Sequence, residues 1–107
     1  MKKVRITELA GVIRSKNSGP YELTFDIIFK DRRAFELARR SGLFRKELFA
    51  ELYGVGVKKV IGVVEFAEAN AIKATIVRPV VSGAPGETDV YGAQQHAPLL
   101  SIEVPVV

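Results

Sequence analysis

The stretch ELTFDIIF (Glu22–Phe29) constrains the fold of this chain most, because large apolar side chains recur in it at every second position. Side chains alternate between the two faces of a β-strand, so this period predicts a strand with one face against a core. Thr24 and Asp26 fall on the opposite face. We expect that face to meet water; the alternative is that Asp26 lies in a site beside Arg14 or Arg78.

After this strand the period changes from two to that of a helix. Asp31 can cap a helix that begins RRAFELARR, and Gly42 suits its end. A second helix is predicted over FRKELFAELY (Phe44–Tyr53), with Gly54 ending it. In both segments apolar positions recur three or four residues apart, so each helix should turn one face to the core.

Four other stretches predict strands. Glu8–Ser15 and Ala71–Pro79 each show apolar side chains on one face. Val60–Phe66 is a short β-branched apolar run, which is typical of a strand buried on both faces. The terminal LLSIEVPVV also has strand character, and its Pro105 favours an edge position.

The order of these elements predicts the fold class. Two strands, two helices and two strands follow one another, the order ββααββ, and a long C-terminal loop and an edge strand complete the chain. We therefore expect a single α+β domain over residues 1–107, with an antiparallel sheet and two helices packed on one face.

The composition excludes several kinds of site. The 107 residues include no cysteine and one histidine, which excludes disulfides, cysteine nucleophiles and multi-histidine zinc sites. We expect no metal and no cofactor. No stretch reaches the roughly 18 apolar residues that span a bilayer, and Arg5 and Glu8 interrupt any signal-like apolar run. A cytoplasmic protein without membrane contact is expected.

Positive charge is concentrated in the middle of the chain. Asp31–Lys59 carries eight Lys/Arg and four Asp/Glu, whereas Pro79–Val107 has no Lys/Arg. The basic helices raise the question of nucleic acid, but Glu36, Glu47 and Glu51 are interspersed and no aromatic platform accompanies them. Mixed charges at helical spacing favour intrahelical ion pairs, so we expect a solvated face and no nucleic-acid partner.

The segment Val81–Pro98 has no period and exceeds the roughly 4–6 residues of a usual connection. Five of its side chains carry chemistry: Asp89, Tyr91, Gln94, Gln95 and His96. An imidazole oriented by Asp89 would make His96 a catalytic general base, and the amides would bind a carbonyl oxygen. The alternative is a loop that packs on the sheet with its amides bonded to backbone.

A second polar segment lies at the end of the first predicted strand, before a turn. There Arg14 and Lys16, with turn amides, would hold a carboxylate or phosphate; the alternative is a solvated hairpin. We hypothesise that this segment and the loop meet at one end of the sheet. The composite ligand-binding surface would contain Arg14, Ser15, Lys16, Asn17, Asp89, Tyr91, Gln95 and His96.

A resemblance to a known family covers nearly the whole chain, and three stretches carry it. The clearest parts of it are LAGVIRSKNSGPYELTFDIIF, LYGV and AIKATIVRPVVSGAPGETDVYGAQQHAPLL. They resemble a small family of domains of unknown function encoded beside AtuA-like acyclic terpene utilisation proteins. The turn after Ile13 is also similar to one in the ferredoxin-like domain at the C-terminus of AtuA-type proteins, which implies a ferredoxin-like two-layer sandwich. Lys16 and Asn17 stand where that domain has Gly and Asp.

The resemblance implies a small accessory subunit of a larger AtuA-like protein, in the catabolism of branched or terpenoid acids as coenzyme A (CoA) thioesters. Its ligand would be a CoA thioester or a carboxylate. Two alternatives stay open. One is a stand-alone lyase or hydrolase with His96 as base and Arg14 holding a carboxylate. The other is a structural module that forms a homo-oligomer.

Overall fold

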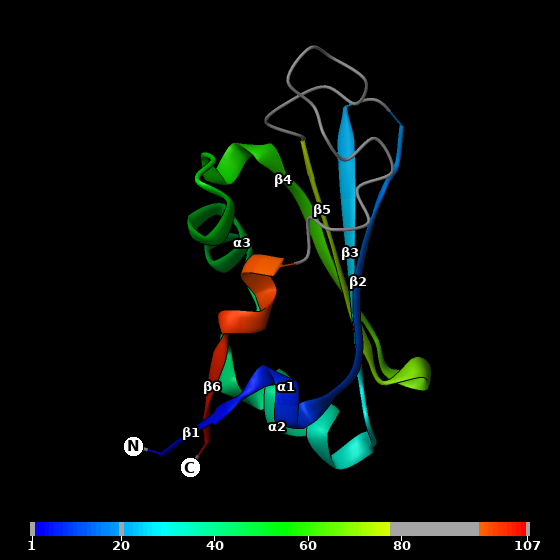
Figure 1. Cartoon of the computed structure of the whole chain (residues 1–107), viewed down its shortest axis with the longest axis vertical. Helices are drawn as coiled ribbons and strands as arrows, with labels where there is room; N and C mark the ends of the chain where they lie inside the picture. Colours follow the sequence, from blue (N-terminus) through cyan, green and yellow to red (C-terminus); the bar gives the residue numbers. More distant parts are fainter. Residues whose placement is uncertain (1, 20, 78–96, 107) are drawn as a thin grey trace.

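The central element of the fold is a four-stranded antiparallel sheet with the strand order β2-β3-β5-β4. A computed structural model describes residues 2–19, 21–77 and 97–106 of the chain. The four strands are β2 (Ala10–Asn17), β3 (Glu22–Phe29), β4 (Val60–Phe66) and β5 (Ala71–Val77). The strands β3 and β5 are therefore the two central strands and pair with each other. The strand β2 pairs with β3, β4 pairs with β5, and β2 and β4 form the two edges (Figure 1).

A second sheet joins the two ends of the described chain. It consists of β1 (Lys2–Arg5) and β6 (Glu103–Val106), which pair antiparallel. The helical turn α1 (Ile6–Leu9) follows β1, and the 3₁₀ helix η3 (Ala97–Ser101) precedes β6. These four elements lie on the same side of the central sheet as the helices (Figure 1).

Two helices and two short 3₁₀ turns complete the fold. They are α2 (Arg32–Ser41), α3 (Lys46–Tyr53), η1 (Val57–Lys59) and η2 (Ala67–Ala69). The predicted helix signals are confirmed: the Ala34 backbone N–H donates to Asp31 Oδ1 at 2.8 Å. Gly42 and Gly54 end the helices in the left-handed region, with φ of 70° and 64°.

The core fills the space between the helices and the sheet face toward them, which we call the inner face. Leu23, Phe25 and Ile27 of β3 lie on it and are at most 1% exposed. The Phe25 ring stacks on Tyr53 of α3, with 4.5 Å between ring centroids. Phe29 meets the edge of the Phe35 ring of α2 at 6.1 Å. The period-two stretch therefore anchors both helices, as predicted.

Several element boundaries differ from the sequence prediction, among them the start of α3, which is Lys46 rather than Phe44. The first long strand begins at Ala10 rather than Glu8, because Ile6–Leu9 forms a helical turn. The strand β1 was not predicted, since its four residues KKVR are mostly charged. The terminal segment is a 3₁₀ helix followed by a short strand in which Pro105 lies opposite Lys3, at an edge as expected.

The prediction that Val60–Phe66 is buried on both faces is wrong. The strand β4 lies at a sheet edge, and only Val60 in it is buried. An apolar run shows which side chains a strand has, but not whether other elements cover it. The sequence therefore could not distinguish a strand buried on both faces from an exposed edge strand.

The expected α+β class is confirmed, with antiparallel sheets and helices on one face of the central sheet. The order ββααββ occurs from β2 to β5, but β1 and α1 precede it and β6 pairs in a separate sheet. The ferredoxin-like arrangement stays a prediction. Most of the predicted Val81–Pro98 loop lies outside the described residues; its last two residues belong to η3.

Candidate functional site on the β2 edge

The predicted site residue Arg14 is held by an ion pair on the sheet face away from the helices, which we call the outer face. Its Nε donates to Asp26 Oδ2 at 3.2 Å, and Asp26 lies directly opposite on β3. Lys73 of β5 continues the same row, opposite Asp26. The Arg14 side chain remains 64% exposed, so its guanidinium is accessible to a ligand.

Asp26 thus occupies one of the two placements considered from the sequence, beside Arg14. The other placement, beside Arg78, lies outside the described residues. Thr24 lies on the outer face between Lys16 and Thr75 on the neighbouring strands, and it is only 3% exposed. The expectation that this face simply meets water is therefore wrong at Thr24.

The four predicted binding residues of β2 divide between the two faces of the sheet. Arg14 and Lys16 are exposed on the outer face, opposite Asp26 and Thr24. Ser15 is 6% exposed on the inner face opposite Phe25, and Asn17 is half-buried on that face. All four belong to the strand, because β2 continues two residues further than predicted.

The turn that was expected to offer amides to an anion is at residues 18–21. Its Ser18 backbone N–H donates to the carbonyl oxygen of Glu22 at 2.9 Å, which closes the hairpin and engages that amide. Gly19 follows with φ of 96°, a conformation that favours glycine. The Ser18 amide is therefore not available to an anion, whereas the Arg14 and Lys16 side chains are exposed.

The second half of the predicted composite surface lies outside the described residues. It comprises Asp89, Tyr91, Gln94, Gln95 and His96. The convergence of this segment with Arg14 and Lys16, and the general-base role of His96, stay predictions.

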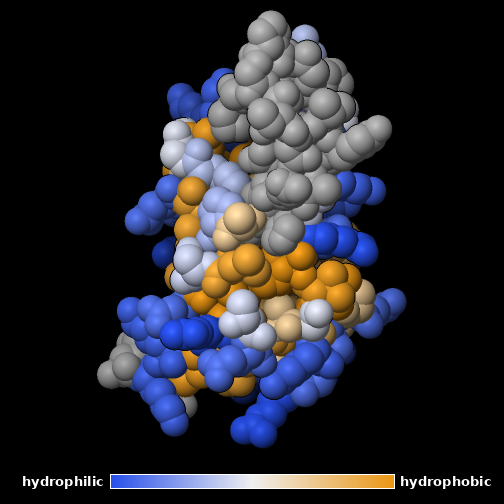
Figure 2. All heavy atoms as spheres, viewed as in Figure 1, coloured by the Kyte–Doolittle hydropathy of each residue, from blue (hydrophilic) through white to orange (hydrophobic). Residues whose placement is uncertain are grey.

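A feature that the sequence did not predict lies at the start of β2. A shallow groove is lined by residues of α1, β2 and η3, of which Val12 and Leu100 are 44% and 45% exposed. The complete lining is Thr7, Ala10, Gly11, Val12, Ile13 and Leu100. Apolar surface gathers where η3 approaches β2 (Figure 2). The groove joins segments about ninety positions apart in the sequence, so no local pattern signals it.

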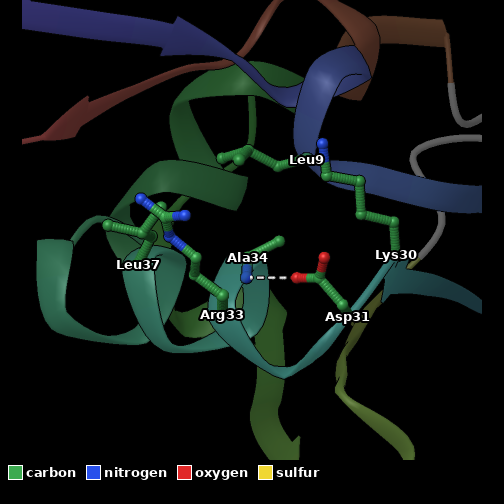
Figure 3. Close-up of a pocket in the computed structure, with 6 residues that line it drawn as sticks. All are labelled: Leu9, Lys30, Asp31, Arg33, Ala34 and Leu37. Atoms are coloured by element: carbon green, nitrogen blue, oxygen red, sulfur yellow. Dashed lines mark hydrogen bonds between the residues drawn. The ribbon is translucent and has the colours of Figure 1, made fainter.

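Another pocket lies at the start of α2 and has a structural explanation. Its lining residues are Leu9, Lys30, Asp31, Arg33, Ala34 and Leu37 (Figure 3). The Asp31 carboxylate points at the helix N-terminus and accepts the Ala34 backbone N–H. The carboxylate therefore already occupies the position where a helix N-terminus would attract an anion.

The basic helix faces are stabilised within the chain. Arg39 Nη2 donates to Glu36 Oε2 at 2.8 Å, and Arg40 Nε lies 3.8 Å from the same oxygen. The hydrogen bond from Arg39 lowers the pKa of Glu36, with further lowering by the nearby arginines. Arg32 Nη1 donates to the Ala67 carbonyl oxygen at 2.9 Å. The prediction of intrahelical ion pairs on a solvated face is confirmed for α2.

No three His, Cys, Asp or Glu side chains within residues 2–19, 21–77 and 97–106 gather into a potential metal site. Among the helices formed by these residues, none has the length and apolar character to traverse a bilayer.

These features define a small α+β domain. Its edge strand β2 pairs on one side only within the described residues, and it combines an apolar groove with exposed cations. The chain belongs to the family described as domain of unknown function (DUF4387), which matches residues 6–103. The match extends from the first residue of α1 to the first residue of β6. No curated protein and no solved structure matches the chain. Membership in a family of domains of unknown function is confirmed, whereas the link to AtuA-like proteins stays a prediction.

Proposed function

We propose that this chain is an accessory subunit that docks on a larger AtuA-like protein through the β2 edge and presents Arg14 and Lys16 to an anionic group. The observation that carries the proposal is the continuity of that edge. The groove at Val12 and Leu100 continues along a single strand into the two exposed cations. An apolar patch beside charged groups is a common composition for a protein–protein interface.

The anionic group would be the carboxylate of a branched or terpenoid acid, or the phosphates of its CoA thioester. A guanidinium binds either group with paired hydrogen bonds, and an ammonium adds a point charge. Asp26 supports this role because its carboxylate fixes the direction of the Arg14 side chain through the bond at Nε. The AtuA-type context and the ferredoxin-like arrangement enter through the resemblance of the sequence.

Partner binding is tested by measuring the affinity of the purified chain for an AtuA-like protein. Val12→Asp and Leu100→Asp should each weaken binding on the order of tenfold or more, because a charge would enter the apolar centre of the interface. Val57→Asp is the matched control, since Val57 is also 44% exposed but precedes the opposite edge strand, β4. Equal binding by Val12→Asp and Val57→Asp would contradict docking through β2.

Anion binding is tested by calorimetry of the complex with isovaleryl-CoA and with free isovalerate. The double variant Arg14→Ala/Lys16→Ala should bind both probes more weakly, with Arg45→Ala, another exposed arginine, as the control.

Deletion of residues 89–96 should abolish turnover by the reconstituted pair. Turnover of hydroxyacyl or enoyl thioesters by the isolated chain, lost in His96→Ala, would instead support the stand-alone enzyme.

A further inference from the structure

The edge strand β4 is apolar on both faces and yet largely exposed. Ile61, Val64 and Phe66 are 50%, 49% and 47% exposed. By its pairing with β5, Val63 lies on the inner face with Ala74, and Val64 lies on the outer face with Lys73. No strand of the described residues pairs with the free side of β4. A sequence typical of a strand covered on every side therefore lies at an open edge.

The two edges of the central sheet differ in how they are protected against pairing. Both edge strands have a bulge at their start, but the β2 edge also carries the cations Arg14 and Lys16 within the strand. Charged side chains are a common device against edge-to-edge association. In β4 the only charged side chain is Glu65, and the strand pairs regularly with β5 from Gly62 to Phe66 after one bulge. An exposed regular apolar edge is a template for another strand.

The charges that flank β4 indicate which strand it accepts. Lys58 and Lys59 precede the strand, whereas Glu65 lies near its end and Glu68 lies just beyond it. When two copies of such a strand run antiparallel, the basic start of each lies beside the acidic end of the other. A parallel partner of the same sequence would instead place like charges together, which is destabilising.

We propose that β4 pairs antiparallel with β4 of a second copy of this chain, about a two-fold axis near Val63. The two four-stranded sheets then form one continuous eight-stranded sheet. With the axis at Val63, Gly62 of each copy lies opposite Val64 of the other. Lys58 of η1 and Glu68 of η2 lie just beyond the two ends of β4. The antiparallel arrangement brings Lys58 of each copy near Glu68 of the other, so the interface contains two such pairs. A two-fold interface of this kind uses the same surface on both subunits.

This inference is independent of the proposed function, which uses the opposite edge of the sheet. It is tested first by analytical ultracentrifugation of the full chain over a range of concentrations. The wild type should form a dimer, and Val64→Lys should be monomeric at concentrations at which the wild type is dimeric. Circular dichroism and thermal unfolding establish that the variant is folded. A wild type that stays monomeric throughout would overturn the proposal, as would a Val64→Lys dimer of unchanged affinity.

The orientation and register are tested by charge reversal and mixing. Lys58→Glu and Glu68→Lys should each weaken self-association on the order of tenfold, because each places two like-charge pairs in the dimer. An equimolar mixture of the two variants should form a heterodimer of near wild-type affinity, since both pairs are then opposite in sign. Lys46→Glu, an exposed reversal on α3, should leave the affinity unchanged. Failure of the mixture to recover affinity would contradict the antiparallel pairing.

Discussion

Tyr53 is a half-buried polar side chain whose ionisation makes the stability of the core depend on pH. Its ring packs against Phe25 on the inner face of the sheet. Burial raises the pKa of its phenol well above the ordinary value of 10.0, because the charged phenolate is poorly solvated there. In the unfolded chain the phenol is free to ionise near that ordinary value.

We therefore predict that Tyr53 makes the protein less stable in alkali. Above about pH 10 the unfolded state has lost the Tyr53 proton while the folded state keeps it, so the free energy of unfolding falls as the pH rises. Urea unfolding between about pH 8 and 11 measures this dependence. Subtracting the curve of Tyr53→Phe removes the contribution of lysines and other groups. A difference between the two proteins that is constant with pH would contradict the prediction.

At the scale of elements, the helix ends depend on backbone conformations that suit glycine. Gly42 ends α2 with φ of 70°, and its N–H donates to the Arg39 carbonyl oxygen at 3.3 Å. An added Cβ would meet no atom within 4 Å there, so the cost of a substitution is conformational and not steric. Gly42→Ala should lower the free energy of unfolding by about 1–2 kcal/mol.

The matched control is Gly56→Ala, because a Cβ at Gly56 also meets nothing within 4 Å and its φ is −69°. That substitution should be neutral or slightly stabilising. Chemical denaturation of both variants provides the comparison, and equal losses would show that the left-handed conformation is not the cause.

The elements that were predicted from the sequence are those whose signals are local. The period of two in β3, the Asp31 cap and the Gly42 stop each depend on residues within a few positions. The strand β1 depends on pairing with β6, about a hundred residues away, so its own four residues could not reveal it. The exposure of β4 depends likewise on which elements cover it.

In the candidate site too, the sequence predicted the features that depend on local residues and missed those that depend on distant ones. The sequence placed Arg14 and Lys16 at a strand end, and the register adds the Asp26 partner and assigns each side chain to a face. The groove at Val12 and Leu100 arises from the packing of η3 near α1 and β2, and no periodicity contains that information. The sequence thus predicted single strands and helices, but not the surfaces that they form together.

At the scale of the whole molecule, Ile6 joins the two sheets into one core. Its side chain is fully buried, and its backbone N–H donates to the Ile102 carbonyl oxygen at 2.9 Å. We predict that Ile6→Ala lowers the free energy of unfolding by about 2–5 kcal/mol in a single cooperative transition.

The measurement is urea unfolding followed by both far-ultraviolet circular dichroism and tyrosine fluorescence. Ile61→Ala, at an apolar side chain that is 50% exposed, is the control and should cost much less under conditions in which the protein is monomeric. Separate transitions for the two probes would show that the β1–β6 sheet unfolds by itself.

The pairing of β1 with β6 also determines how this domain can be attached to other proteins. Lys2 lies opposite Val106, and both are at the end of the molecule away from the Asn17 end of β2 (Figure 1). A tether at either terminus, or an insertion that uses both, leaves the molecule from one small area. An attached protein would therefore lie away from the end of the central sheet at which β2 ends.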